Sequence, residues 1–195
     1  WGFALDKALA DVGGLDALKD PAQAEKVEAA QAEARAFVKK VFANVRSGMP
    51  AGARGATDDF VKNKGGDAFL AWENEAILAK NFAEGELEII VPSISVKAEP
   101  PVAVVDKVVD RRGTRDLAEA YLRYMYEPES QETIARAHYR PCLPEIAEKF
   151  RAKFPETRLF TVDDVFGGWL KAQRTHFNSG GEFDRIVEEN LREGK

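Results

Sequence analysis

The chain has 195 residues, 45% of them hydrophobic and 31% charged, which is typical of a globular protein and excludes a membrane span, a collagen-like repeat and a disordered tail. Its 28 Lys and Arg against 33 Asp and Glu give a formal charge of -5 without a basic run, so nucleic acid is not an expected partner. The single cysteine, Cys142, and two histidines are too few for an internal disulfide or a structural zinc site, and no metal or cofactor is expected.

The N-terminal part of the sequence predicts helices. Residues 1–9 place apolar side chains on one helical face with no start methionine, and we interpret the sequence as a truncated chain that opens inside an amphipathic helix. Asp20 before Pro21 is typical of a helix start. Apolar residues then recur at three- and four-residue steps over residues 27–45, which predicts one long helix that ends near Gly48.

The middle of the sequence alternates between loop, strand and helix signals. Small residues with Gly and Pro at 49–56 lead into a helix whose predicted N-cap is Thr57. The apolar run at 68–72 is predicted to be a strand buried on both faces, and Glu73 opens the next helix. A turn is expected at residues 84–85.

Two β-branched segments, residues 87–91 and 102–105, are predicted strands that cross between two lobes. The C-terminal half is predicted to be mostly helical. Its expected elements are a helix capped by Thr114, a helix from Pro128 to about Ala137, a loop over 138–144, a helix over 145–154, a short strand at 159–160, a helix with a capping box of Thr161 and Asp164, and a last helix over 183–191. Strands that alternate with helices indicate an α/β fold with a mainly parallel sheet.

The loop over residues 52–57 is the first candidate for chemistry. Its small residues let a ligand approach the backbone, and the helix that follows points unpaired N–H groups and the positive end of its dipole toward that ligand. This arrangement favours an anion. The loop lacks the Lys and the glycine spacing of a P-loop, so a nucleoside triphosphate is not predicted, and an ordinary loop-to-helix turn remains the alternative.

Trp72 is the second candidate, because it ends a predicted strand. Ligands of open α/β sheets gather outside the carboxyl ends of the strands, where the indole N–H is well placed to donate a hydrogen bond. A core tryptophan whose N–H is satisfied locally remains the alternative.

Three other features suggest structure rather than chemistry. Glu73 and Glu75 are expected to face different directions, as solvated or capping residues rather than as a glycosidase pair. His138 and Cys142 lie in a proline-rich loop with no third group to orient a base, so a thiol nucleophile is not predicted. His176 is expected at a helix surface or at the edge of a core.

Several short motifs together resemble the sulfate- and thiosulfate-binding receptors of bacterial ATP-binding-cassette importers. The motifs follow the family's order, and this agreement carries the resemblance more than any single motif. They are Gly52-Ala53-Arg54-Gly55, residues 71–76, Ala98-Glu99-Pro100-Pro101, residues 104–109, residues 118–122, Tyr139-Arg140-Pro141, Phe166-Gly167-Gly168-Trp169 and Lys171-Ala172-Gln173. The stretch from Asp11 to about Glu33 matches poorly, which predicts an insertion in a surface helical hairpin.

The resemblance implies a type II periplasmic-binding-protein fold, in which two α/β lobes joined by crossovers close on a dehydrated oxyanion. It also implies a binding protein rather than an enzyme. Family members hold sulfate through neutral donors, and the two that fall inside this sequence are the backbone N–H of Ala53 and the indole N–H of Trp72. Gly52, Arg54 and Gly55 are expected to support the loop, with Arg54 behind it or in solvent.

A site made only of donors suits sulfate, which is fully deprotonated at neutral pH and can only accept hydrogen bonds. A protonated phosphate would meet a donor where it needs an acceptor, so rejection of phosphate is expected. Helix dipoles rather than a lysine are expected to neutralise the charge, which keeps binding reversible.

The resemblance also divides the chain and predicts its context. Residues 1–90 correspond to part of the second lobe, with the anion loop and Trp72, and residues 91–195 to the crossover and the C-terminal part of the first lobe. The family's remaining donors lie upstream of Trp1, so this polypeptide is expected to bind sulfate weakly or not at all without the missing N-terminal portion. The expected location is the periplasm, and the expected protein partners are the permease subunits of the importer.

Two alternative functions stay open. One is a binding protein for another tetrahedral oxyanion. The other is an α/β enzyme that acts on a phosphorylated small molecule, which would need an acid, a base or a metal in its cleft. A fragment that folds only with its other half is compatible with the receptor.

Overall fold

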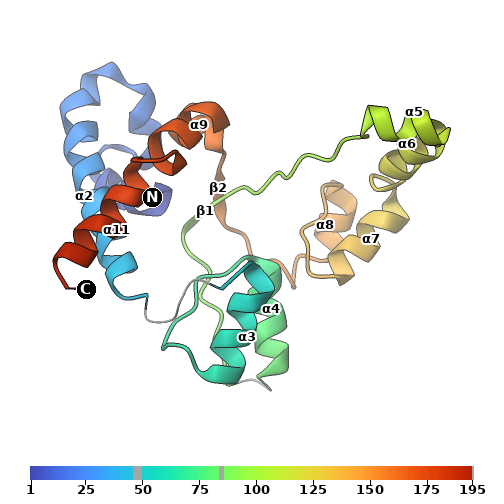
Figure 1. The fold of residues 1–195 in the computed structure, drawn as a ribbon, viewed down its shortest axis with the longest axis horizontal. Coiled ribbons are helices and arrows are strands. Elements are labelled where there is room, and N and C mark those ends of the chain that lie inside the picture. The colour runs from blue at the N-terminus through green and yellow to red at the C-terminus, as the bar shows by residue number, and fades with distance from the viewer. Residues whose placement is uncertain (46–49, 84–85, 195) are drawn as a thin grey trace. The chain divides into compact units, whose positions relative to one another are not determined.

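The computed structural model describes residues 1–45, 50–83 and 86–194, and the chain separates into two compact units (Figure 1). Unit 1 contains Trp1–Gly48, Val91–Ala98 and Thr157–Lys195, and unit 2 contains Met49–Ile90 and Glu99–Glu156. These units are discontinuous in the sequence, whereas the sequence analysis divides the chain once, after residue 90. The assignment of either part to a lobe of a complete receptor stays a prediction.

Unit 1 is mostly helical. Its elements are α1 (Gly2–Ala8), the 3-10 helices η1 (Ala10–Val12), η2 (Gly14–Lys19) and η3 (Pro21–Gln23), α2 (Ala24–Ala43), α9 (Val162–Phe166), α10 (Trp169–Ala172), the π-helix η4 (Gln173–Phe177) and α11 (Glu182–Arg192). The predicted helix start is confirmed, because an Asp20 carboxylate oxygen accepts a hydrogen bond from the Ala22 N–H at 2.9 Å. α2 ends at Ala43, and Gly48, the predicted end, lies outside the described residues.

A two-stranded parallel sheet in unit 1 joins segments that are far apart in the sequence. β1 (Ile94–Val96) pairs with β2 (Arg158–Phe160), and Ile94 stands opposite Arg158. The strand predicted at 159–160 is therefore confirmed. β1 is not among the predicted strands, although β-branched side chains alternate along it.

The predictions of strands at 68–72, 87–91 and 102–105 are wrong for the described chain, and the sheet of the described residues, although parallel as predicted, has only two strands. No described residue of these three segments belongs to a strand, and Leu70, Ile90 and Val105 expose 84%, 75% and 64% of their surface. Strand propensity reflects packing on a pleated surface, and an isolated extended segment is not stable without a partner ladder. The three segments therefore have the amino-acid composition of strands but form no hydrogen-bonded ladder among the described residues.

The core of unit 1 forms where α1 packs against α2, η2 and the sheet. Its buried hydrophobic residues are Ala4, Leu5, Leu9, Leu15, Ala17, Ala30, Ala34, Ile94 and Phe160. Gly2 is required at this contact, because the ring of Phe160 occupies the space where a side chain at that position would begin. The amphipathic pattern predicted for residues 1–9 thus reflects a real buried face.

Gly2→Ala is expected to lower the free energy of unfolding by about 1–3 kcal/mol, because the added methyl overpacks the contact with Phe160. Thermal unfolding followed by circular dichroism measures the change. Gly66→Ala is the matched control, since the atom nearest to its added methyl lies 3.7 Å away. Equal stability of the two variants would show that Phe160 does not pack against Gly2.

Unit 2 contains six helices among its described residues, namely α3 (Ala53–Asn63), α4 (Glu73–Phe82), α5 (Asp106–Arg112), α6 (Arg115–Tyr124), α7 (Pro128–Arg136) and α8 (Pro144–Lys149). The predicted starts at Thr114 and Pro128 are confirmed, whereas α8 ends five residues before the predicted Phe154. Phe154 instead packs with Ala135 and Ile146 in a small core. The predicted turn at 84–85 lies outside the described residues.

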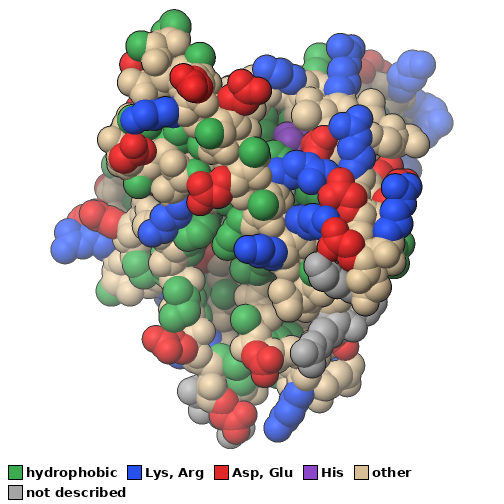
Figure 2. Space-filling view, turned by 90° about the vertical axis from the view of Figure 1, so that its left-hand side faces the viewer, with side chains coloured by type: hydrophobic (Ala, Val, Ile, Leu, Met, Phe, Trp, Pro, Cys, Tyr) green, Lys and Arg blue, Asp and Glu red, His purple; other side chains and the backbone are tan. Residues whose placement is uncertain are grey.

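The surface carries charges of both signs. On the face drawn in Figure 2, acidic and basic side chains are interspersed, with hydrophobic side chains between them. Of the helices in the three described ranges, none combines the length and the apolar character that a membrane crossing requires.

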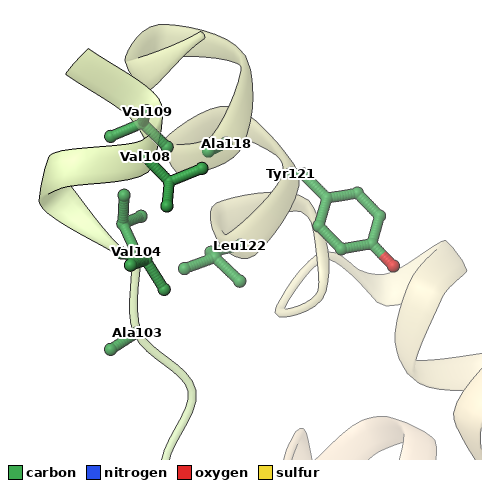
Figure 3. A pocket seen from close by; sticks show the side chains of 8 residues that line it. Ala103, Val104, Val108, Val109, Ala118, Tyr121 and Leu122 are labelled. Carbon is green, nitrogen blue, oxygen red and sulfur yellow. The ribbon is translucent and has the colours of Figure 1, made fainter. Parts of the chain in front are cut away.

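An apolar hollow of about 250 Å³ lies in unit 2 between α5, α6 and the segment that precedes α5 (Figure 3). Its lining residues are Ala103, Val104, Val105, Val108, Val109, Ala118, Tyr121 and Leu122. The hydroxyl of Tyr121 is the one polar side-chain group in this lining, and it points away from the aliphatic side chains (Figure 3). The hollow therefore lacks the side-chain donors that an anion needs, and it contains none of the predicted site residues.

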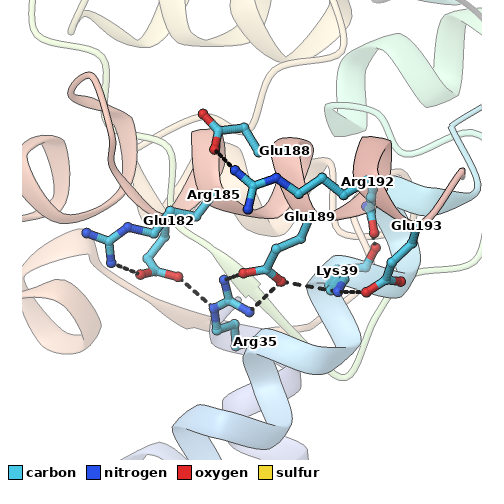
Figure 4. Close-up of polar contacts among 9 residues, drawn as sticks. Arg35, Lys39, Glu182, Arg185, Glu188, Glu189, Arg192 and Glu193 are labelled. Atoms are coloured by element: carbon cyan, nitrogen blue, oxygen red, sulfur yellow. Dashed lines mark hydrogen bonds and ion pairs between the residues drawn. The ribbon is translucent and has the colours of Figure 1, made fainter.

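A network of ion pairs joins α2 to α11 in unit 1 (Figure 4). Arg35 donates to Glu182 at 2.8 Å and to Glu189 at 2.7 Å, and Lys39 lies 3.1 Å from Glu189 and 2.5 Å from Glu193. Hydrogen bonds from Arg35 and then from Lys39 lower the pKa of Glu189 to about 2. The network thus fixes the C-terminal helix against the long helix of the same unit.

Candidate anion-binding site

The small-residue loop ends at the first turn of α3. Gly52 is the N-cap and has a φ of 85°, a value that residues with a side chain rarely adopt. The N–H of Ala56 donates to the carbonyl oxygen of Gly52 at 3.2 Å. The N–H groups of Ala53, Arg54 and Gly55 precede this bond and have no backbone acceptor in the helix. Among the described residues, the unpaired N–H groups of α3 thus belong to residues 53–55.

The prediction of Thr57 as the N-cap is wrong, because α3 begins four residues earlier, at Ala53. Gly52, whose backbone angles are not helical, is the N-cap instead. Thr57 lies in the second turn and is fully buried. Its hydroxyl lies 3.1 Å from the Ala53 carbonyl oxygen and 2.7 Å from a carboxylate oxygen of Glu75. Thr57 thus connects the first turn of α3 to the next helix.

Trp72 is the N-cap of α4 and has extended backbone angles, φ -62° and ψ 147°. It exposes 55% of its surface, and its indole N–H has no hydrogen-bond partner among the described residues. The alternative of a core tryptophan with a satisfied N–H therefore does not describe this structure. The predicted opening of a helix at Glu73 is confirmed.

A buried carboxylate connects the N-terminal turns of α3 and α4. Glu75 exposes 6% of its surface, and the Arg54 guanidinium donates to both of its oxygens at 3.1 Å. The bonds from Arg54 and then from Thr57 lower the pKa of Glu75, and the same pairing raises the pKa of Arg54. Arg54 thus supports the loop through Glu75, while more than half of its side chain remains exposed.

Sequence reasoning missed the roles of Glu75 and Thr57. The available signal was a single Arg in a small-residue loop, followed by a Thr in the next turn and a Glu in the first turn of the following helix. The expectation that Glu73 and Glu75 face different directions is confirmed, because Glu73 pairs with Arg140 at 2.6 Å rather than with Arg54. Two carboxylates with separate arginine partners do not form a catalytic pair.

The other candidates do not form a reactive site in the described chain. No hydrogen bond joins the side chains of His138 and Cys142, and the N–H of Cys142 instead donates to the Gln131 side chain at 2.7 Å. His176 lies at the edge of a core, with its ring centroid 5.0 Å from that of Trp1, and burial lowers its pKa. The described residues contain no cluster of three or more His, Cys, Asp or Glu that could hold a metal ion.

Comparison with known proteins shows the class of protein to which this chain belongs. Residues 6–140 match the family described as bacterial extracellular solute-binding protein. The chain belongs to this family, whose members are binding proteins rather than enzymes.

Three relatives illustrate the match. The chain is 51% identical over 157 residues to a sulfate-binding protein of Escherichia coli, which covers 80% of this chain and 47% of that protein. It is 45% identical over 159 residues to a thiosulfate-binding protein of Pseudomonas aeruginosa, covering 81% of this chain and 48% of that protein. It is 39% identical over 151 residues to a sulfate-binding protein of Synechocystis, covering 77% of this chain and 43% of that protein. The chain thus spans about half the length of these relatives.

Proposed function

We propose that this chain is part of a receptor that captures sulfate or thiosulfate and delivers it to the permease of an ATP-binding-cassette importer. The complete receptor has a type II periplasmic binding fold and works in the periplasm. The backbone N–H of Ala53 and the indole N–H of Trp72 are the donors that this chain supplies. The names of the relatives support the ligand class, since they include both sulfate-binding and thiosulfate-binding proteins.

One observation carries the proposal. The free N–H groups at the start of α3 belong to a turn that Glu75 ties to α4, the helix that Trp72 caps. Neutral donors and the positive end of a helix suit an oxyanion that can only accept hydrogen bonds. Because Arg54 is paired with Glu75, its charge is compensated before an anion arrives. Selectivity then depends on the direction of the donors rather than on charge alone.

A chimera tests the proposal, because it supplies the rest of a receptor. The aligned segment of the E. coli sulfate-binding protein is replaced by this chain, and sulfate binding is measured by titration calorimetry, with phosphate as the selectivity control. We expect sulfate to bind and phosphate to bind far more weakly, because phosphate keeps a proton that finds no acceptor. A chimera that folds but binds neither sulfate nor thiosulfate would contradict the proposal.

Trp72→Phe in this chimera is expected to weaken sulfate binding about 10- to 100-fold, the effect of losing one hydrogen bond to a charged group. The matched control is Trp169→Phe, which removes another exposed indole, in unit 1. Calorimetry of both variants gives the comparison. Equal sulfate affinities of the Trp72 and Trp169 variants would show that the Trp72 indole does not bind the anion.

The isolated chain is expected to bind sulfate weakly or not at all. Native mass spectrometry determines whether the purified material is the chain alone, with a mass of 21.6 kDa, or a larger complex. Tryptophan fluorescence with added sulfate then measures binding, with chloride as the control for ionic strength. Micromolar affinity of the chain alone would show that its own donors are sufficient.

A further inference from the structure

Glu75 is a buried acid at the start of a helix, and its burial needs a physical explanation. A carboxylate that exposes 6% of its surface loses most of its hydration, and this loss is unfavourable unless hydrogen bonds replace it. A helix N-terminus alone favours an acid but does not require its burial. The partners of Glu75 therefore indicate what the burial achieves.

Those partners come mainly from a different helix. Arg54 donates to both carboxylate oxygens and Thr57 adds a contact of 2.7 Å, and both residues belong to α3. Within α4, the neighbouring Asn74 contributes one long contact of 3.4 Å. The hydration that Glu75 loses is thus replaced mostly by the first two turns of α3. The buried contact holds only while the N-terminal turns of the two helices stay together.

The contact lies within one helical turn of each proposed donor. Arg54 follows Ala53 directly, and Glu75 lies three residues after Trp72. A carboxylate that accepts two bonds from one guanidinium resists both translation and rotation of its partner. Motion of the first turn of α3 relative to that of α4 would break these bonds.

We infer that Glu75 is a positioning residue, which holds the first turns of α3 and α4 together so that the Ala53 N–H and the Trp72 indole N–H face the same anion. This inference rests on the proposed function. Glu75 does not touch the anion in this arrangement, because its oxygens accept bonds and would repel an oxyanion. It acts through the placement of neutral donors.

Glu73 provides a matched control within the same helical turn. It is also an acid paired with an arginine, but its partner is Arg140, and its oxygens accept no bond from α3. Glu73→Gln and Glu75→Gln therefore remove the same charge from the same helix terminus. Only the second replacement weakens the connection to α3.

The test is an NMR comparison of the full chain and its variants. Residual dipolar couplings of backbone amides, measured without sulfate, report the relative orientation of α3 and α4. Sulfate affinity is then measured by titration calorimetry on the chimera with the E. coli sulfate-binding protein, which carries the same substitutions and supplies the rest of a receptor. Two further variants change no charge. Thr57→Val removes the second donor to Glu75, and Thr57→Ser retains it.

We expect Glu75→Gln to change the orientation of α3 relative to α4 and to weaken sulfate binding by the chimera about tenfold. Glu73→Gln is expected to leave both unchanged. Thr57→Val is expected to shift the orientation in the same direction as Glu75→Gln, and Thr57→Ser to preserve it. Because Thr57→Val keeps both charges, it remains informative if Glu75→Gln does not fold.

Three results would overturn the inference or separate it from the proposed function. Unchanged couplings in folded Glu75→Gln and Thr57→Val would overturn it, since the helices would then be held by other contacts. Tighter sulfate binding by Glu75→Gln would also overturn it and would show that Glu75 acts by masking Arg54. If the substitutions change the couplings but the chimera with the wild-type segment does not bind sulfate, the helices are positioned by Glu75 while the anion function fails.

Discussion

Leu9→Ala is expected to lower the free energy of unfolding of unit 1 by about 2–5 kcal/mol, the largest effect that we predict for stability. Leu9 exposes 1% of its surface and packs in the cluster that joins α1, α2 and the sheet. The replacement removes buried methyl groups and leaves a cavity in a small core. Because unit 1 is assembled from three separate segments of sequence, loss of this cluster should release all of them.

Urea denaturation measures this effect. Trp1 packs against the cluster, so its fluorescence reports unit 1 when Trp72 and Trp169 are both replaced by Phe. Leu170→Ala is the control, because Leu170 exposes 79% of its surface and its truncation is expected to change stability by no more than about 0.5 kcal/mol. A Leu9 variant as stable as the Leu170 variant would contradict the assignment of the core.

Arg35→Met is expected to lower the free energy of unfolding by about 1–3 kcal/mol at neutral pH. The variant removes the charged donor that Glu182 and Glu189 share in the network of Figure 4. A hydrogen bond to a charged group contributes more to stability than an exposed ion pair does. The Arg35 side chain is only 30% exposed, so its bonds belong to the stronger kind. Arg174→Met is the control, since Arg174 is exposed and makes no ion pair among the described residues.

The same network predicts how stability depends on pH. The pKa of Glu189 falls from 4.5 to about 2 in the folded chain, so the folded state binds this proton less readily than the unfolded state. The stabilisation by Glu189 is therefore complete above the unfolded pKa and is lost as the pH falls from 4.5 toward about 2. Urea titrations across this range should give a weaker pH dependence for Arg35→Met than for wild type. Parallel curves would contradict the role of Arg35.

Local signals in the sequence determined most of the helices. Asp20 before Pro21 marks a real cap, and the predicted capping box of Thr161 and Asp164 forms with both of its reciprocal hydrogen bonds. Such signals act within a few residues and do not depend on distant parts of the chain. The start of α3 is an exception, because the sequence predicts Thr57 as its cap and the helix begins at Ala53.

Only the tertiary structure decided which extended segments became strands and which acid became buried. A strand needs a partner ladder, so residues 68–72 and 102–105 remain unpaired although their composition favours a sheet, while β1 pairs with residues 158–160, which lie far along the chain from it. Glu75 resembles an ordinary acid in a first helical turn until Arg54 and Thr57 close over it. Burial and pairing depend on contacts between distant residues, which no local pattern contains.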